Sequence, residues 1–478
     1  MNWETIIGLE VHVELDTKTK IFCNCPTTFG SPPNQNTCPV CIGLPGTLPV
    51  LNEAVVEMAV KAGVALNCSI QKTNKMDRKN YFYPDLPKAY QISQYDLPIC
   101  TGGHVEIDRG GEKRKIRVHR IHIEEDAGKL LHDEEEPISF IDYNRVGVPL
   151  IEIVSEADMR SPEEAVAYLR SVRSILQYAG VSDCRMEQGS LRCDGNISVR
   201  PFGQDAFNAK VELKNINSFK ELQKALEKEE KRQLELYSFN EGDKVVQETR
   251  RWDAAKGKTI SMRTKEDAHD YRYFPDPDLK PIFIQEELIH RVEKELPELP
   301  AEKSKRFLET YGLSLKEVEI LVNEMALSHF YEEVVEAGAD PKTSANWILG
   351  DLLRVMKEKE MTAEEQPLKA KHLVSLIQFI EKGSISVTAG RDVFDTMIET
   401  GKSPDRIIEE KGLKQISGEY ELQQTILSVL EANPSSVEDF KNGKKQALGF
   451  LMGQVMKATK GQANPQVAKT MMEKKLNG

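Results

Sequence analysis

Residues 6–15 have the sequence IIGLEVHVEL, in which polar and apolar side chains alternate after the glycine. Successive side chains of a β-strand point to opposite faces of its sheet. The alternation therefore predicts a strand with Glu10, His12 and Glu14 on one face and apolar, core-facing side chains on the other. Taken alone, this pattern describes a half-buried strand with a solvated polar face.

Three further β-patterned runs also carry carboxylate or imidazole side chains. These side chains are His122, Glu124 and Glu125 in and just after residues 116–124, Glu152 in residues 149–155, and Glu212 in residues 209–216. A carboxylate in an apolar strand is costly unless something compensates its charge. Several carboxylates on neighbouring strands, together with an imidazole, predict a site for Mg²⁺ or Mn²⁺, which favour oxygen ligands.

Four cysteines form two close pairs, Cys23 with Cys25 and Cys38 with Cys41, and twelve residues separate the pairs. Each pair can supply two thiolates from one turn, as tetrahedral zinc requires. A long intracellular chain keeps its cysteines reduced, so this spacing favours metal binding over disulfides. Four protein ligands leave no open position, and the predicted zinc site in the loop 23–41 is therefore structural.

Residues 77–94, DRKNYFYPDLPKAYQISQ, concentrate lysines and tyrosines in a proline-containing segment. Pro84 and Pro87 exclude a helix, and the lysine and tyrosine side chains combine apolar bodies with polar tips. Such a segment fits a substrate pocket or an aromatic and basic nucleic-acid surface, with a merely structural loop as the alternative.

The texture of the sequence changes at about residue 293. Residues 1–292 mix short β-patterned runs with glycine- and proline-rich loops and a few helices, which predicts an α+β domain. Residues 293–403 have helical apolar spacing, and residues 404–478 predict a small helical tail domain. The sequence has no apolar run of 18 residues and begins without signal-peptide features, so we expect a cytoplasmic protein with no membrane partner.

The net charge of −12 is distributed unevenly along the chain. From Lys441 to the end there are eight lysines and one acid, Glu473, so this segment carries +7 and the rest of the chain −19. A basic appendage on an acidic body suggests that the tail holds a polyanion, with a solvated lysine face as the alternative. The candidate contacts are Lys444, Lys445, Gly449, Gly453, Lys457 and Lys460.

Neither common glycine-rich nucleotide fingerprint is present. Gly401-Lys402-Ser403 resembles the end of a phosphate-binding loop, but Thr396 occupies the position of its required first glycine. Any ATP site must therefore be built in another way.

Several stretches together resemble the B subunit of the aspartyl/glutamyl-tRNA amidotransferase family. In chain order they include IGLEVHVEL (7–15), DRKNYFYPDLPKAYQISQ (77–94), HIEEDAGK (122–129), VELKNINSF (211–219), DYRYFPDPDL (270–279) and GFLMGQVMKATKGQANP (449–465). The similarity covers essentially the whole chain.

The resemblance implies a cradle-shaped mixed α/β catalytic domain, an all-helical middle domain and a tail domain that contacts tRNA. It implies a carbon–nitrogen ligase that uses glutamine as amido donor and works as a heterotrimer with an amidase A subunit and a small C subunit. The resemblance further implies that ATP phosphorylates the side-chain carboxylate of Glu-tRNA(Gln) or Asp-tRNA(Asn), and that ammonia from the A subunit displaces the phosphate. The preference between the two tRNAs stays open.

The resemblance also implies roles for particular residues. The catalytic residues would be Glu10, His12, Glu125, Lys79 and Tyr81. The divalent metal would be bound by Glu10, His12, Glu125 and Glu152, with Glu124 and Glu212 nearby. The path of the substrate or of ammonia would be lined by Lys88, Tyr90 and Asp85. Strict alternation would put Glu124 rather than Glu125 beside His122, so a ligand at Glu125 requires a bulge or a strand end. The cysteine quartet is optional in the family, so the predicted zinc depends on spacing alone.

Two other functions fit parts of the sequence. A zinc-ribbon RNA-binding factor without catalysis would not need Glu10 or Glu125. A metal-dependent phosphohydrolase would use the same carboxylates and hydrolyse ATP without tRNA. ATP consumption with and without Glu-tRNA(Gln) distinguishes all three.

Overall fold

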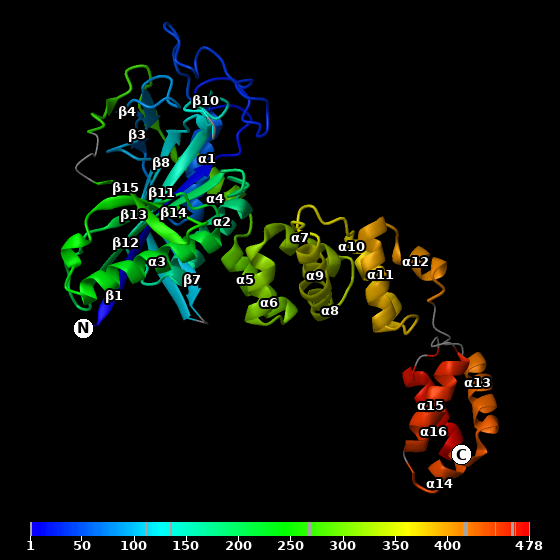
Figure 1. Ribbon diagram of the computed structural model, residues 1–478. Helices are drawn as coiled ribbons and strands as arrows, with labels where there is room; N and C mark the ends of the chain where they lie inside the picture. The colour runs from blue at the N-terminus through cyan, green and yellow to red at the C-terminus, as the bar shows by residue number, and fades with distance from the viewer. Residues whose placement is uncertain are drawn as a thin grey trace. The chain divides into compact units, whose positions relative to one another are not determined.

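The predicted N-terminal strand, β1 (Trp3–Glu14), lies inside a ten-stranded sheet in the computed structural model (Figure 1). It pairs antiparallel with β11 (Pro149–Ser155) on one side and with β12 (Leu191–Pro201) on the other. Beyond β11 follow β8 (Glu112–Glu125), β6 (Cys100–Thr101) and β2 (Ser69–Ile70), and beyond β12 follow β13 (Val211–Lys214), β14 (Glu248–Asp253) and β15 (Lys258–Thr264). Only the β13–β14 pair is parallel among these neighbours, and β7 (His104–Arg109) pairs with β8.

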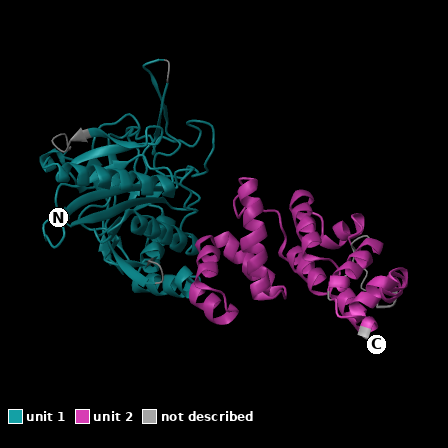
Figure 2. Cartoon of the chain, turned by 60° about the horizontal axis from the view of Figure 1, so that its bottom comes forward, with its two compact units in different colours: residues 1–302 teal, residues 303–478 magenta. Residues whose placement is uncertain are grey.

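The structure describes residues 2–109, 112–133, 136–264, 270–413, 419–444, 446–459, 463 and 465–477. Contacts divide the chain into two units, residues 1–302 and 303–478, which Figure 2 colours separately. The sheet and its helices occupy the first unit, and the second is helical, which confirms the predicted α+β class. The finer predicted boundaries, at residues 292/293 and 403/404, stay predictions.

One face of the sheet is covered by α1 (Glu53–Ala65), α2 (Pro162–Tyr178) and α3 (Phe219–Ser238). Ile7, Leu9, Val11 and Val13 of β1 are fully buried on this face, and burial of each contributes about 1.5–3 kcal/mol. The three helices begin at residues whose side chains accept a hydrogen bond from the first turn, namely Asn52, Ser161 and Ser218. Glu10, His12 and Glu14 consequently lie on the opposite face of the sheet.

A β-bulge divides β8 at His119. Ser155 of β11 lies opposite Val118, whereas Val154 lies opposite Arg120, so β8 carries one extra residue there. The bulge lets Val118 and Ile121 both face the core, and it places Arg120, His122 and Glu124 on the polar face.

The segment 77–94 forms two short strands joined by a loop. β4 (Asp77–Asn80) and β5 (Tyr90–Ser93) pair with each other, and β16 (Phe274–Pro275) adds a third strand. The prolines lie in the loop between the strands, consistent with their exclusion of a helix. Two further small sheets pair β3 (Thr73–Asn74) with β17 (Ile282–Phe283) and β9 (Lys129–His132) with β10 (Ser139–Asp142).

Most of the described helices follow β17 along the chain. They are α4 (Glu286–Glu295), α5 (Pro300–Tyr311), α6 (Leu315–Asn323), α7 (Met325–Glu336), α8 (Pro341–Asn346), a π-helical turn (Trp347–Leu352), α9 (Leu353–Glu358), α10 (Ala370–Glu381), α11 (Val387–Thr400), α12 (Pro404–Glu410), α13 (Glu419–Ala432), α14 (Pro434–Lys441), α15 (Gln446–Ala458) and α16 (Pro465–Asn477). None of the described helices combines the length and the apolar composition that crossing a membrane would require.

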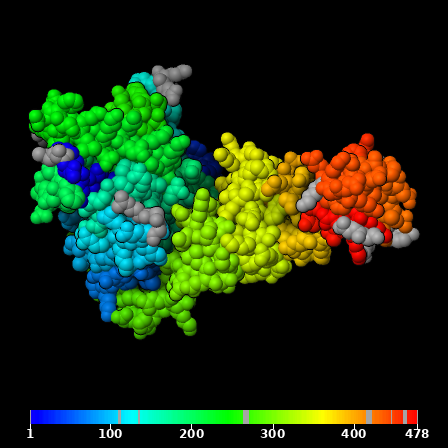
Figure 3. Space-filling view, turned by 90° about the horizontal axis from the view of Figure 1, so that it is seen from below, coloured from blue at the N-terminus to red at the C-terminus, as the bar shows by residue number. Residues whose placement is uncertain are grey.

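Helices α13 to α16 have a hydrophobic core of their own. Leu422 and Ile426 of α13 pack with Leu451 and Val455 of α15 and with Met472 of α16, and all five are fully buried. Figure 3 shows these helices, from orange to red, as one continuous mass of side chains. They therefore form a separate packing unit within residues 419–477.

Candidate functional site

A row of three side chains crosses the polar face of the sheet. His12 of β1 lies opposite Glu152 of β11, and Glu152 lies opposite His122 of β8. The Oε2 atom of Glu152 is 3.3 Å from Nε2 of His12 and 3.4 Å from Nε2 of His122. The register of the three strands thus places one carboxylate between two imidazoles.

Glu124, two residues beyond His122 on β8, completes this cluster. Its Oε1 lies 3.7 Å from Nε2 of His12, and its Oε2 lies 3.6 Å from Nε2 of His122. One ligand atom from each of His12, Glu124 and Glu152 lies within 4.8 Å of the others. One nitrogen and two carboxylates are a donor set suited to Mg²⁺ or Mn²⁺.

The electrostatics of the cluster also fit a divalent cation. Burial alone would lower the pKa of His122, but its hydrogen bonds to Glu124 and Glu152 raise that pKa to about 9. Burial would likewise raise the pKa of Glu152, but the two imidazoles hold it well below its usual value. These pKa shifts favour negative charge on Glu152 with positive charge beside it, which a divalent cation could supply.

Glu10 and Glu212 lie on the same polar face but are not among the three clustered ligands. The Nδ2 group of Asn196 donates to Oε1 of Glu10 at 2.9 Å, and burial followed by the charge of Glu152 raises the pKa of Glu10. Glu212 accepts a hydrogen bond from Thr249 at 2.7 Å and pairs with Lys214 at 3.0 Å. The sequence pattern did not identify Asn196 as a site residue. It lies opposite Glu212, and its position in the alternation of β12 puts it on the same face.

Glu125 is not brought to the cluster. The pairing of β8 with β11 is regular at Glu124 and Glu125, so the two side chains point to opposite faces of the strand. Glu125 instead pairs with the ammonium group of Lys88 and accepts a hydrogen bond from the backbone N–H of Ile92 at 2.8 Å. The bulge that a ligand at Glu125 would require lies at His119, too early in the strand to turn Glu125 toward the cluster.

The Lys88–Glu125 pair lines a cavity of about 260 Å³. Its wall also includes residues 43–49, which come shortly after the last cysteine of the quartet, together with Lys20, Arg78 and Tyr90. The Arg78 guanidinium lies 4.3 Å from the centroid of the Tyr90 ring, and the Nζ atom of Lys88 lies 5.2 Å from the same centroid. Two of the residues predicted for a substrate or ammonia path, Lys88 and Tyr90, thus share one cavity.

Tyrosines from two distant segments of the chain meet beside Lys79. The Nζ atom of Lys79 lies 4.9 Å from the ring centroid of Tyr271 and 5.7 Å from that of Tyr81. Burial, followed by the charges of Asp85 and Glu124, raises the pKa of Tyr81. Burial, followed by the charges of Glu124 and Glu152, likewise raises the pKa of Tyr273. Tyr271 and Tyr273 were not singled out in the sequence, although DYRYFPDPDL contains both.

Asp85, the third residue predicted for the path, lies in the loop between β4 and β5. Its backbone carbonyl accepts a hydrogen bond from the N–H of Gly128 at 2.8 Å. Burial raises the pKa of its side chain. Asp85 therefore ties this loop to the residues that follow β8.

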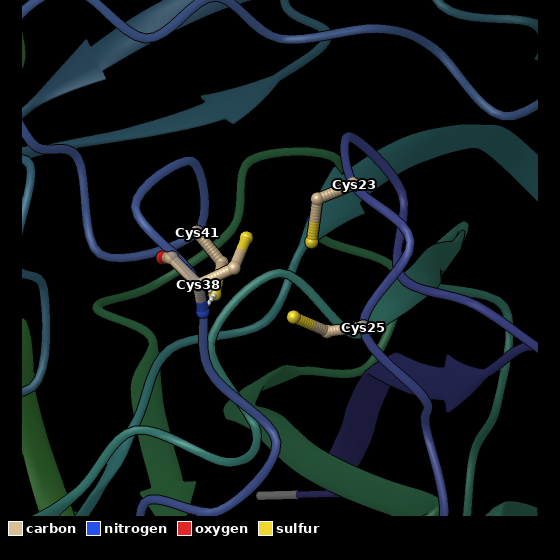
Figure 4. Close-up of side chains that lie close together, drawn as sticks. All are labelled: Cys23, Cys25, Cys38 and Cys41. Carbon is tan, nitrogen blue, oxygen red and sulfur yellow. Dashed lines mark hydrogen bonds between the residues drawn. The ribbon is translucent and has the colours of Figure 1, made fainter.

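The four cysteines converge as their spacing predicts, and Figure 4 shows the side chains gathered together. Their sulfur atoms all lie within 4.8 Å of one another. The Sγ atom of Cys41 accepts hydrogen bonds from the backbone N–H of Cys38 at 3.1 Å and from the fully buried Lys20 ammonium at 3.7 Å. A hydrogen bond from Cys23, aided by Lys20 against the effect of burial, lowers the pKa of Cys41 to about 5. Four sulfurs, one of them favoured as thiolate, make a site that could hold a metal ion.

The candidate tRNA contacts lie on or beside α15. Gly449, Gly453 and Lys457 are spaced by four residues and so share one helix face. No described atom approaches the positions that a Cβ would occupy at the two glycines, so this face is open. Lys444 pairs with Asp439 at 2.9 Å. Lys445 and Lys460 lie outside the described residues.

Comparison with known proteins gives matches along nearly the whole chain. Residues 5–290 match the family described as the GatB/GatE catalytic domain, and residues 329–476 match the GatB domain. The second of the B subunits named for aspartyl/glutamyl-tRNA(Asn/Gln) amidotransferase in Clostridium acetobutylicum is 62% identical over 477 residues, covering 100% of both chains. The B subunits of the same enzyme from Clostridium beijerinckii and Thermoanaerobacter pseudethanolicus are 61% and 55% identical with the same coverage.

Proposed function

We propose that this chain, which belongs to the family of aspartyl/glutamyl-tRNA amidotransferase B subunits, catalyses the tRNA-dependent amidation for which its relatives are named. The substrate is Glu-tRNA(Gln) or Asp-tRNA(Asn), whose side-chain carboxylate is a poor acceptor for ammonia. Phosphorylation by ATP converts the carboxylate into an acyl phosphate, and attack by ammonia then expels phosphate and leaves the amide. The observation that carries this proposal is the His12–Glu124–Glu152 cluster inside the segment that matches the catalytic domain.

His12, Glu124 and Glu152 would hold Mg²⁺ or Mn²⁺, with Glu10 and Glu212 on the same face of the sheet. The cation supplies charge that neutralises the phosphates of ATP during transfer. His122 donates toward both clustered carboxylates and keeps them in place. The neighbouring carboxylates of Glu10 and Glu212 add negative charge that attracts the cation to this face.

Glu125 and Lys88 would serve the delivery of ammonia rather than the metal. Their cavity lies on the other side of β8 from the cluster, one residue away along the strand. A carboxylate there can accept a proton from ammonium and release neutral ammonia, the nucleophile. Lys79, Tyr81, Tyr90 and Asp85 would line the route and position the aminoacyl group.

The four cysteines would bind a structural Zn²⁺. Two pairs of ligands joined by one loop leave no open coordination position, so the ion would stabilise the loop without taking part in the reaction. That loop continues into residues 43–49, which form part of the wall of the Lys88–Glu125 cavity.

The relatives are named as subunits, and we propose a heterotrimer with an amidase A subunit that makes ammonia from glutamine and a small C subunit. The α15 face with Gly449, Gly453 and Lys457 would dock the sugar–phosphate backbone of tRNA. Such contacts position the substrate and carry little sequence information. We place the enzyme in the cytoplasm, where tRNA is aminoacylated.

ATP consumption by the assembled complex, with and without Glu-tRNA(Gln), tests the function. We expect ADP and amidated tRNA to form together only when the charged tRNA and an amide donor are present. ATP hydrolysis independent of tRNA would indicate a phosphohydrolase. Binding of tRNA with no ATP consumption would indicate a non-catalytic RNA-binding factor.

A further inference from the structure

Arg120 is a cation on the polar face, one row away from the metal-binding cluster. It lies opposite Val154 of β11, and Val154 in turn lies opposite Glu10 of β1. The neighbouring row is His12–Glu152–His122, and rows two residues apart along a strand are separated by about 7 Å. Arg120 therefore flanks the cluster at a distance that a bound phosphate chain can span.

Arg120 alternates with His122 and Glu124 along β8, so all three face the site. The bulge at His119 comes directly before them and separates this alternation from that of the preceding residues, so that Val118 and Ile121 both point into the core. Bulges of this kind re-aim side chains and are common next to active sites.

The guanidinium of Arg120 is not engaged by a carboxylate. Among the residues that the structure describes it has no ion-pair partner, and its buried Nε atom has no hydrogen-bond partner. Arg192, which lies opposite His12 in β12, is instead held by Asp126 at 2.7 Å, and Arg117 of β8 is held by Asp158 at 2.7 Å. A buried N–H group without an acceptor is costly, and an external anion would supply the acceptor that the Nε–H of the half-buried Arg120 lacks.

We propose that Arg120 binds the γ-phosphoryl group of ATP on this face. The inference rests on the proposed function and adds to it a residue that contacts the transferred group. A triphosphate must approach Glu10, Glu124 and Glu152, and a cation beside the metal is needed to offset their repulsion. The planar guanidinium can donate two parallel N–H groups to two phosphoryl oxygens.

The transfer itself leaves the arginine unchanged. A side-chain carboxylate oxygen of the substrate forms a bond to the γ-phosphorus while the bond from that phosphorus to the bridging oxygen of ADP breaks. ADP leaves with the electron pair, and no proton moves. Arg120 stabilises the charge on the equatorial oxygens of the phosphoryl group.

The attacking carboxylate is the other anion that Arg120 could contact. Pairing with a guanidinium would draw charge from that nucleophile and slow its attack, whereas the same contact on the phosphoryl oxygens favours the reaction. The two assignments predict different nucleotide binding, because only a contact with the γ-phosphoryl group makes affinity depend on the third phosphate.

The test compares the binding of adenylyl imidodiphosphate, a non-hydrolysable ATP analogue, with that of ADP in the assembled complex with Mg²⁺. Arg120→Ala should weaken binding of the analogue by about 10- to 100-fold and leave binding of ADP unchanged. It should also lower kcat for amidation about 100-fold with an unchanged KM for charged tRNA. Guanidinium ion added to Arg120→Ala should restore part of the rate. Arg117→Ala, on the same strand, is the matched control and should match wild type in all these measurements.

Equal weakening of the analogue and ADP, or a raised KM for charged tRNA with normal nucleotide binding, would overturn the assignment. A variant that only melts at a lower temperature would overturn it as well. If Arg120→Ala does not fold, Arg120→Lys is used in its place, because lysine keeps the charge but lacks the paired donors. Loss of the tighter binding of the analogue relative to ADP would support the inference, and a wild-type ratio of the two affinities would contradict it. Wild-type complex that consumes no ATP with charged tRNA would instead contradict the proposed function itself.

Discussion

Glu152 has a particular position among the described carboxylates of the cluster, because it lies directly between two imidazoles across three strands. Its neighbours lower its pKa although burial opposes ionisation. Glu125, by contrast, directly follows Glu124 in the chain, so its side chain points to the other face of β8. Two adjacent glutamates can thus serve two different parts of one reaction.

Glu152→Gln should weaken the binding of Mn²⁺ at least about 10-fold, because the amide removes the charge shared by both histidines. Amidation should fall in parallel. Electron paramagnetic resonance of free Mn²⁺ measures the affinity, and Glu156→Gln, which alters an exposed carboxylate beside His119, is the control. Unchanged Mn²⁺ affinity would place the cation elsewhere.

Glu125→Gln should abolish amidation while the partner subunit still hydrolyses glutamine. Because its side chain pairs with Lys88 and faces away from the cluster, Mn²⁺ affinity should stay within about threefold of wild type. Glutamine hydrolysis, amidation and Mn²⁺ binding are measured on the same preparation. A large loss of Mn²⁺ affinity would return Glu125 to the metal site.

The cysteine loop, residues 23–41, leads directly into a segment that lines the Lys88–Glu125 cavity. Its sulfurs converge beside the buried Lys20, which also donates to the backbone carbonyl of Asn36 at 2.7 Å. Metal, lysine and backbone would therefore stabilise the same loop, and the cavity wall at residues 43–49 depends on it.

Purified protein should contain about one zinc per chain, and Cys38→Ser should lose it together with thermal stability. Cys68→Ser is the matched control, because Cys68 lies outside the quartet. Elemental analysis of protein prepared without chelators measures the metal. Wild-type protein free of zinc would refute the site.

Helices α13 to α16 are the part of the molecule best suited to removal as a block. Their core is their own, whereas Ile407 and Ile408 of α12 are buried and α12 packs against α10 and α11. A cut after residue 413 therefore leaves the preceding helices complete.

This truncation should raise the KM for charged tRNA and flatten its dependence on salt. The log–log slope should fall by roughly 0.7–0.9 for each tRNA phosphate that the shortened protein no longer binds. Turnover of ATP at saturating tRNA should survive in part, because the clustered carboxylates lie in the other unit. In the full chain, Lys457→Glu should act in the same direction, and Lys359→Glu, at the exposed end of α9, should not. A lower melting temperature with an unchanged KM would show that the tail only supports the helices.

Local patterns in the sequence predicted those features that depend on backbone periodicity or on short spacings. The period of two in residues 6–15 placed Glu10 and His12 on one face, and the cysteine spacing brought four sulfurs together. Both follow from neighbours in the chain, so no knowledge of distant contacts was needed.

Contacts between distant segments determined which side chains from different strands lie together in the site. Strand order put β11 between β1 and β8, so that Glu152 lies between both histidines, and the register of β8 against β11 puts Arg120 in the next row on the same face. Burial, followed by the charges of Glu124 and Glu152, raises the pKa of Tyr273, which lies more than 100 residues further along the chain than either glutamate. Strand pairing is selected by burial of the whole apolar face, and a shift of one residue reverses every side chain. Alternation within one strand therefore specifies a face, while only the packed sheet specifies which faces meet.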